Sequence, residues 1–105
     1  LVDATDADFG EIVDTQRLVL VDLWAPWCGP CRMVAPILEK LSREFADSLK
    51  VVKVNVDGSP GISQRFNASS IPMLVFMRNG EHIDTVIGAQ PEPILRDAVQ
   101  RLTAG

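Results

Sequence analysis

The sequence predicts an α/β fold in which a central mixed β-sheet is flanked by helices on both faces. Extended apolar segments alternate along the chain with segments of helical periodicity, and strands joined by helices are expected to pair in parallel with right-handed crossovers. The Asn79-Gly80 dipeptide is a strong hairpin signal, so the last two strands are expected to be antiparallel. The 105 residues fit one domain of the commonest size, and we expect residues 1–105 to form it.

The first half of the chain predicts a short helix, a buried strand and a long helix. The run Leu18–Trp24 is apolar and β-branched and is interrupted only by Asp22, which is typical of a strand buried on both faces. Residues 31–47 carry apolar side chains at helical spacing, and Pro36 inside this helix predicts a kink. The apolar residues of the short first helix are Phe9, Ile12 and Val13.

The second half predicts three more strands and two more helices. Ser59-Pro60 combines an N-cap residue with a proline suited to the first helical turn, and this helix is expected to reach about Phe66. A last helix is expected to begin between residues 91 and 93. Its apolar face carries Ile94, Leu95, Ala98, Val99 and Leu102. The predicted strands are residues 51–56, 71–77 and 82–87.

The composition argues against two classes of partner. Ten Lys and Arg against fourteen Asp and Glu give a net charge of −4 with no basic stripe, so we expect no nucleic-acid partner. The longest apolar run, residues 71–77, is far too short to cross a bilayer, so we expect no association with a membrane.

The N-terminal residues do not have the pattern of a secretory signal. Acidic residues precede the first basic one, Arg17, and no secretory signal is visible. Because the chain begins at Leu1 rather than Met, a removed leader or upstream domain stays open.

The only two cysteines lie where the first buried strand gives way to the long helix. The free N–H groups and partial positive charge of a helix N-terminus stabilise a thiolate, so Cys28 is expected to ionise readily. Cys31 lies one helical turn further on the same face, within disulfide-bonding reach. This arrangement predicts an exposed attacking thiol, Cys28, and a buried resolving thiol, Cys31. Pro30 fits the first helical turn and stiffens the loop.

Two structural interpretations of this cysteine pair are weaker than redox chemistry. A disulfide that closes so short a loop stabilises a fold by only about 2 kcal/mol in the chain-entropy model. A zinc site needs four ligands, and the chain offers two cysteines and one distant histidine, His82. We therefore expect a redox-active pair and no metal site.

The residues around the cysteines resemble the thioredoxin family. The resemblance rests on Trp27-Cys28-Gly29-Pro30-Cys31, with Asp22 before it and Ile71-Pro72 after it. It implies a thioredoxin fold, thiol–disulfide exchange and no cofactor. Met73 departs from the family, which usually has Thr there, and this puts substrate preference in doubt. Further family-like segments cover essentially the whole chain: Val21-Asp22, Ala35-Pro36, Asn55-Val56-Asp57, Asn79-Gly80-Glu81 and Val86-Ile87-Gly88-Ala89.

Asp22 is the predicted acid–base residue. It interrupts a buried strand, where burial raises the pKa of a carboxyl group. A carboxyl that titrates nearer neutrality is suited to move a proton to or from Cys31, and the resemblance implies that role. The alternative is a structural ion pair with Lys53, which lies among valines on the next strand. We expect Gly29, Pro30 and Lys53 to tune the redox chemistry.

A small apolar patch around Cys28 is the predicted docking surface for substrates. The resemblance implies that Pro72 is cis and lies beside the disulfide, which leaves the backbone of Ile71 free to pair with an extended substrate segment. Trp24 is predicted to lie in the core and His82 to be a plain surface residue. The expected substrate-binding residues are Trp27, Ile71, Pro72, Gly88 and Ala89.

The resemblance implies a general protein-disulfide reductase, an electron carrier that maintains redox homeostasis. The Cys28 thiolate attacks a disulfide of a client protein, and Cys31, deprotonated with help from Asp22, resolves the mixed disulfide. A thioredoxin reductase then reduces the pair again. We expect a monomer in a reducing cytoplasm, and organelle stroma stays open if a transit peptide was removed.

Other kinds of function stay open at the level of sequence. An oxidase or isomerase on the same fold is the nearest, although such relatives usually carry residues other than Gly29-Pro30 between the cysteines. A binding module, a subunit of a larger assembly, is the second, and its function would survive loss of Cys28 and Cys31. A dedicated domain of a longer protein is the third.

Overall fold

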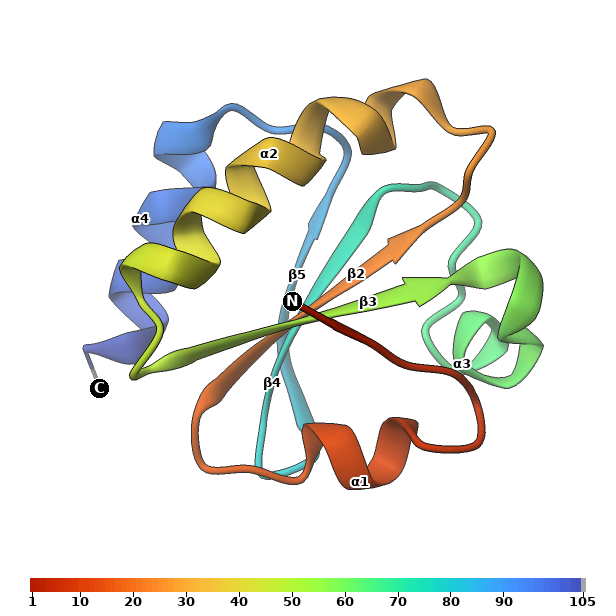
Figure 1. Ribbon diagram of the computed structural model, residues 1–105, viewed down its shortest axis with the longest axis horizontal. Helices are drawn as coiled ribbons and strands as arrows, with labels where there is room; N and C mark the ends of the chain where they lie inside the picture. Colours follow the sequence, from red (N-terminus) through yellow and green to blue (C-terminus); the bar gives the residue numbers. More distant parts are fainter. Residues whose placement is uncertain (105) are drawn as a thin grey trace.

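The computed structural model describes residues 1–104 and confirms the predicted α/β fold. Helices α2 and α4 cover one face of a five-stranded mixed sheet, and α1 and α3 cover the other (Figure 1). The strand order is β1-β3-β2-β4-β5, so β2 is central. Within residues 1–104 no helix is long and apolar enough to cross a membrane.

The elements follow the predicted order, with one addition at the start. The strands are β1 (Val2–Asp3), β2 (Leu18–Trp24), β3 (Leu49–Asn55), β4 (Met73–Arg78) and β5 (Glu81–Ile87). The helices are α1 (Phe9–Val13), α2 (Gly29–Glu44), α3 (Pro60–Arg65) and α4 (Glu92–Thr103), and a 3₁₀ turn covers Val56–Gly58. Strand β1 went unpredicted because two exposed residues carry no hydrophobic pattern.

The direction of β4 corrects the expectation that all strands joined by helices run parallel. β2 pairs in parallel with β3, but β4 is antiparallel to β2, with Met73 opposite Leu23. The connection between β3 and β4 contains the short 3₁₀ turn and α3, whose six residues span about 9 Å. The seven residues of β3 span about 23 Å. Because α3 does not carry the chain back along the strand, β4 begins at the edge of the sheet where β3 ends.

Apolar side chains fill both faces of the sheet. Leu20 and Phe76 pack under α2 and α4, whereas Val21 packs with Phe9 on the side of α1 and α3. Successive side chains of a strand point to opposite faces, so Asp22 lies on the same face as Leu20, under α2. The central strand therefore places one carboxyl group within the apolar layer that supports the long helix.

The N-terminus of α3 is capped from a distant part of the chain. The Asp6 carboxylate accepts hydrogen bonds from the backbone N–H groups of Gly61 (2.8 Å) and Ile62 (2.9 Å). Ser59 occupies the predicted N-cap position, but its side chain makes no capping hydrogen bond. The carboxylate and the helix dipole attract each other, so Asp6 ties the segment before α1 to α3.

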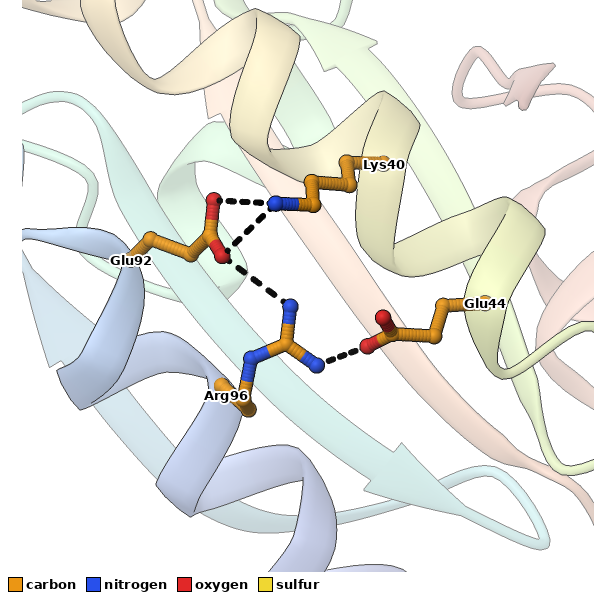
Figure 2. Close-up of polar contacts among 4 residues, drawn as sticks. All are labelled: Lys40, Glu44, Glu92 and Arg96. Carbon is orange, nitrogen blue, oxygen red and sulfur yellow. Dashed lines mark hydrogen bonds and ion pairs between the residues drawn. The ribbon is translucent and has the colours of Figure 1, made fainter.

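An ion-pair network joins α2 to α4 (Figure 2). Glu92 contacts both Lys40 of α2 (3.1 Å) and Arg96 of its own helix (3.0 Å), and Arg96 also pairs with Glu44 of α2. Isolated surface pairs contribute little to stability, but a connected set of four charges holds the two helices in one register. The network thereby stabilises the position of the C-terminal half of α2, the helix whose N-terminus carries the cysteines.

Candidate active site

The two cysteines form a disulfide at the N-terminus of α2. Their Cα atoms are 5.3 Å apart, and Cys28 is the N-cap residue of the helix. The helix begins at Gly29, two residues before the predicted start, because Cys28 acts as the N-cap residue and its sulfur accepts a hydrogen bond from the Cys31 N–H. Pro30 lies in the first turn, where it displaces no hydrogen-bond donor that the helix needs.

The predicted contrast in exposure between the two cysteines is wrong. Both residues are 4% exposed, and both belong to a small cluster with Ala25. Cys28 is covered because Ile71 packs against it, with the carbonyl oxygen of Ile71 3.7 Å from Sγ. The cysteines differ instead in what they face: Cys28 lies against Ile71, and Cys31 lines a cavity that is partly open to the surface.

A backbone donor is already aimed at the sulfur of Cys28. The N–H of Cys31 donates to Cys28 Sγ at 3.2 Å. In the reduced protein this donor and the partial positive charge of the 16-residue helix α2 favour a thiolate on Cys28. The Cys28 sulfur thus lies where a negative charge is favoured.

The segment opposite the disulfide has the predicted backbone geometry. The Ile71–Pro72 peptide bond is cis, as predicted. The carbonyl of Pro72 accepts a hydrogen bond of 2.8 Å from the N–H of Gly88, whose φ of +90° suits glycine. This bond brings the end of β5 beside Pro72. Ala89 follows at a partly exposed position.

Trp27 is held at the surface beside the disulfide. Its side chain is 68% exposed, and its indole N–H donates to Asp57 Oδ2 at 2.9 Å. An exposed aromatic face fixed by a hydrogen bond loses little freedom when a substrate covers it. We did not predict the contribution of Asp57, although Asn55-Val56-Asp57 is part of the family resemblance.

Asp22 lies in an environment that disfavours its charge. It is 1% exposed, and its Oδ1 atom has no hydrogen-bond partner within residues 1–104. Desolvation raises its pKa from 3.8 to about 6, against the opposing effect of the Lys53 charge. The alternative of a structural ion pair is not supported, because no ion pair joins Asp22 to Lys53 in the described part of the chain.

A cavity of about 110 Å³ is lined by both Asp22 and Cys31. Lys53 also lines it. Trp24 lines it too and is half-buried rather than fully within the predicted core. A larger open hollow of about 500 Å³ lies at the far end of the sheet near Arg17 and contains neither cysteine.

The remaining titratable groups form no second centre in residues 1–104. No cluster of three or more His, Cys, Asp or Glu side chains in that range is arranged to hold a metal ion. His82 is exposed, as predicted, but it also packs edge-on against Phe66 with the ring centroids 5.6 Å apart. The chemistry thus centres on the disulfide, Asp22 and the cavity between them.

Replacing Asp22 with Asn is expected to stabilise the oxidised protein at neutral pH but not at acidic pH. Because the pKa of Asp22 is raised to about 6, the folded state favours the protonated carboxyl. Ionisation of the buried carboxyl lowers the free energy of unfolding of the wild type, and this loss is absent below about pH 4 and complete above about pH 6. The loss is on the order of 3 kcal/mol, and the neutral amide of Asn avoids it. Urea unfolding at about pH 4 and pH 8 measures the difference.

The matched control is Asp97→Asn, which removes an exposed carboxylate from α4. It is expected to leave the unfolding free energy nearly unchanged at both pH values. The account of Asp22 would be contradicted if the difference in unfolding free energy between Asp22→Asn and the wild type were the same at acidic and at neutral pH.

Comparison with known proteins agrees with this site. The thioredoxin family model matches residues 1–101. Thioredoxin 1 of Synechococcus elongatus is 44% identical over 98 residues, and the thioredoxin of Porphyra purpurea is 46% identical over 98 residues, each match covering 92% of both chains. The chloroplastic M-type thioredoxin of Spinacia oleracea is 40% identical over 94% of this chain and 55% of its own.

The fold has a close counterpart among solved structures. The crystal structure of Malassezia sympodialis thioredoxin superposes with a TM-score of 0.86 at 35% identity, covering 95% of this chain and 91% of that one. With the Cys28–Cys31 disulfide in place, these matches identify a protein-disulfide reductase that works by dithiol–disulfide exchange. The chain belongs to the thioredoxin family.

Proposed function

We propose that Cys28 is the attacking thiol, Cys31 the resolving thiol and Asp22 the proton acceptor of a general reductase of protein disulfides. One observation carries this assignment. Cys28 Sγ accepts a hydrogen bond from the Cys31 N–H at the helix N-terminus, whereas Cys31 lines the same cavity as Asp22. The two sulfurs therefore have different surroundings, one suited to a thiolate and one to a thiol with a nearby base.

The reaction proceeds in two exchanges. The Cys28 thiolate attacks one sulfur of a substrate disulfide, forms a mixed disulfide and releases the other sulfur as a thiolate, which takes a proton from solvent. Cys31 then loses its proton to Asp22 and attacks the Cys28 sulfur. The mixed disulfide breaks, the second substrate thiol leaves, and Cys28–Cys31 is oxidised. Two electrons pass from the protein to the substrate.

Substrate docking is assigned to the apolar surface around Cys28. Trp27 offers a fixed aromatic face, and the backbone of the half-buried Ile71, next to the cis bond and the buried Pro72, is assigned to pairing with an extended segment. Contacts of this kind suit many clients, because backbone pairing does not depend on the client's sequence. The assigned residues are Trp27, Ile71, Pro72, Gly88 and Ala89. Gly29, Pro30 and Lys53 are assigned to tuning the redox pair.

The proposal extends to the protein's setting. Residues 1–105 act as a single domain and as a monomer, and a thioredoxin reductase returns the disulfide to the dithiol. The protein serves as an electron carrier in redox homeostasis in a reducing cytoplasm, where dithiols are stable. An organelle stroma is the alternative location, and the likeness to chloroplastic M-type thioredoxins of Spinacia oleracea and Pisum sativum favours testing it.

Replacing Cys31 with Ser is expected to trap substrates. Without the resolving thiol, the mixed disulfide at Cys28 persists, so incubation of the variant with a disulfide-containing protein such as insulin yields a covalent adduct. Non-reducing electrophoresis and mass spectrometry measure the adduct, which dithiothreitol releases. The control is Cys28→Ser, which is expected to form far less adduct. Continued multiple turnover by Cys31→Ser, or equal trapping by both variants, would overturn the assignment.

Replacing Asp22 with Asn is expected to slow the second exchange and spare the first. Loss of the proton acceptor slows resolution by roughly 10²-fold near neutral pH, because general acid–base catalysis contributes about that much. Stopped-flow measurement of mixed-disulfide formation, in the Cys31→Ser background, isolates the attack step. The control Asp97→Asn removes an exposed carboxylate from α4, which does not line the cavity. Equal slowing of both steps by Asp22→Asn would argue against a proton-transfer role.

A further inference from the structure

Lys53 is positioned for an ion pair that it does not make. It lies directly opposite Asp22 in the register of β2 and β3, and both side chains line the cavity under α2. Neighbouring strands are about 4.8 Å apart, so a lysine can easily reach a carboxylate on the next strand. No ion pair joins them in residues 1–104, and Asp22 Oδ1 has no partner there.

The Lys53 ammonium lies over the ring of Trp24 instead. Its Nζ atom is 4.8 Å from the ring centroid, within the range of a cation–π interaction. Trp24 lies two residues after Asp22 on β2, so the lysine leans toward the disulfide end of the sheet. Trp24 in turn packs against the cluster of Ala25, Cys28 and Cys31, which fixes the ring.

We propose that Trp24 is a positioning residue whose indole ring holds the Lys53 ammonium at the side of the cavity and thereby keeps it from pairing directly with Asp22. The ring offers the cation a partner that is already packed in place. The cation in turn remains near enough to act on the carboxyl through space. Trp24 therefore decides how strongly Lys53 acts on Asp22.

Lys53 is the charge whose position matters, because the other groups facing Asp22 are accounted for. Arg32 lines the same cavity, but its guanidinium donates to the carbonyl of Pro26 at 2.8 Å. Cys31 carries no charge while it is disulfide-bonded. On the other side of β2, the register partner of Asp22 is the apolar residue Leu74. A direct ion pair with Lys53 would hold Asp22 ionised and unable to take a proton near neutral pH.

The importance of this device for catalysis rests on the proposed proton-transfer role of Asp22, but its geometry is tested independently. Carboxyl ¹³C NMR of the oxidised protein follows the titration of Asp22 without interference from cysteine ionisation. The variants are Trp24→Leu, which keeps an apolar side chain without a ring, and Trp24→Phe, which keeps an aromatic face. Each is made with Lys53 and with Lys53→Met, and circular dichroism checks that each is folded.

With Lys53 present, Trp24→Leu is expected to lower the pKa of Asp22 by about 1, the effect of an opposite charge moving into contact. Trp24→Phe is expected to stay close to the wild-type value. In the Lys53→Met background the drop caused by Trp24→Leu is expected to vanish, since no cation remains to move. An equal drop in both backgrounds would mean that water enters the cavity and would overturn the proposal. No drop with Lys53 present, or an equal drop for Trp24→Phe, would overturn it as well.

A second measurement needs no variant and so does not depend on folding. Ring currents of Trp24 are expected to shift the Lys53 ε-protons upfield of those of Lys40 and Lys50. Lys40 is hydrogen-bonded to Glu92, and Lys50 is hydrogen-bonded to the Ile12 carbonyl. Equal shifts for all three lysines would contradict the geometry. The pH dependence of mixed-disulfide resolution separates the two claims. If the pKa of Asp22 moves in Trp24→Leu but the rate profile does not, the role of Asp22 fails and the positioning role of Trp24 stands.

Discussion

The Asp22 side chain lies in the central strand of the sheet, under the helix that carries both cysteines, where desolvation outweighs the attraction of Lys53. In the described part of the chain, the other buried strand residues on this face are apolar and hold α2 and α4 in place. The carboxyl interrupts that layer beside the cavity that Cys31 also lines. The fold accepts a loss of stability there, and the site gains a group that changes protonation state near neutral pH.

The topology brings the other parts of the site to one edge of the sheet. β2 ends at this edge and leads into α2, so the cysteines meet the free N–H groups of a helix. α3 is too short to return the chain to the far edge, so β4 begins beside β2 and places Ile71-Pro72 against Cys28. The same reversal puts Gly88, at the end of β5, within hydrogen-bonding distance of Pro72.

The sequence predicts the elements well where a local pattern controls them. Leu18–Trp24 was predicted with the bounds that β2 has, because an apolar, β-branched run interrupted only by Asp22 has few alternative structures. The direction of β4 was wrong, since it depends on the length of α3 relative to a strand. The exposure of Cys28 was wrong because Ile71, distant in sequence, covers it. The position of Lys53 over Trp24 was also unpredicted, because register suggests a pair with Asp22 and only the packed side chains show otherwise.

Asp22 and the cavity beside it affect the equilibrium between the dithiol and the disulfide of Cys28 and Cys31. An Asp22 carboxylate beside the cavity opposes a second negative charge on Cys31, which favours the disulfide and makes the dithiol a good reductant. The most direct test is the equilibrium reduction potential of the Cys28–Cys31 pair, titrated in dithiothreitol and glutathione buffers and followed by tryptophan fluorescence. The account predicts a potential more negative than about −230 mV, below the range of glutaredoxins. A potential of about −180 mV or higher, as in disulfide isomerases and oxidases, would contradict it.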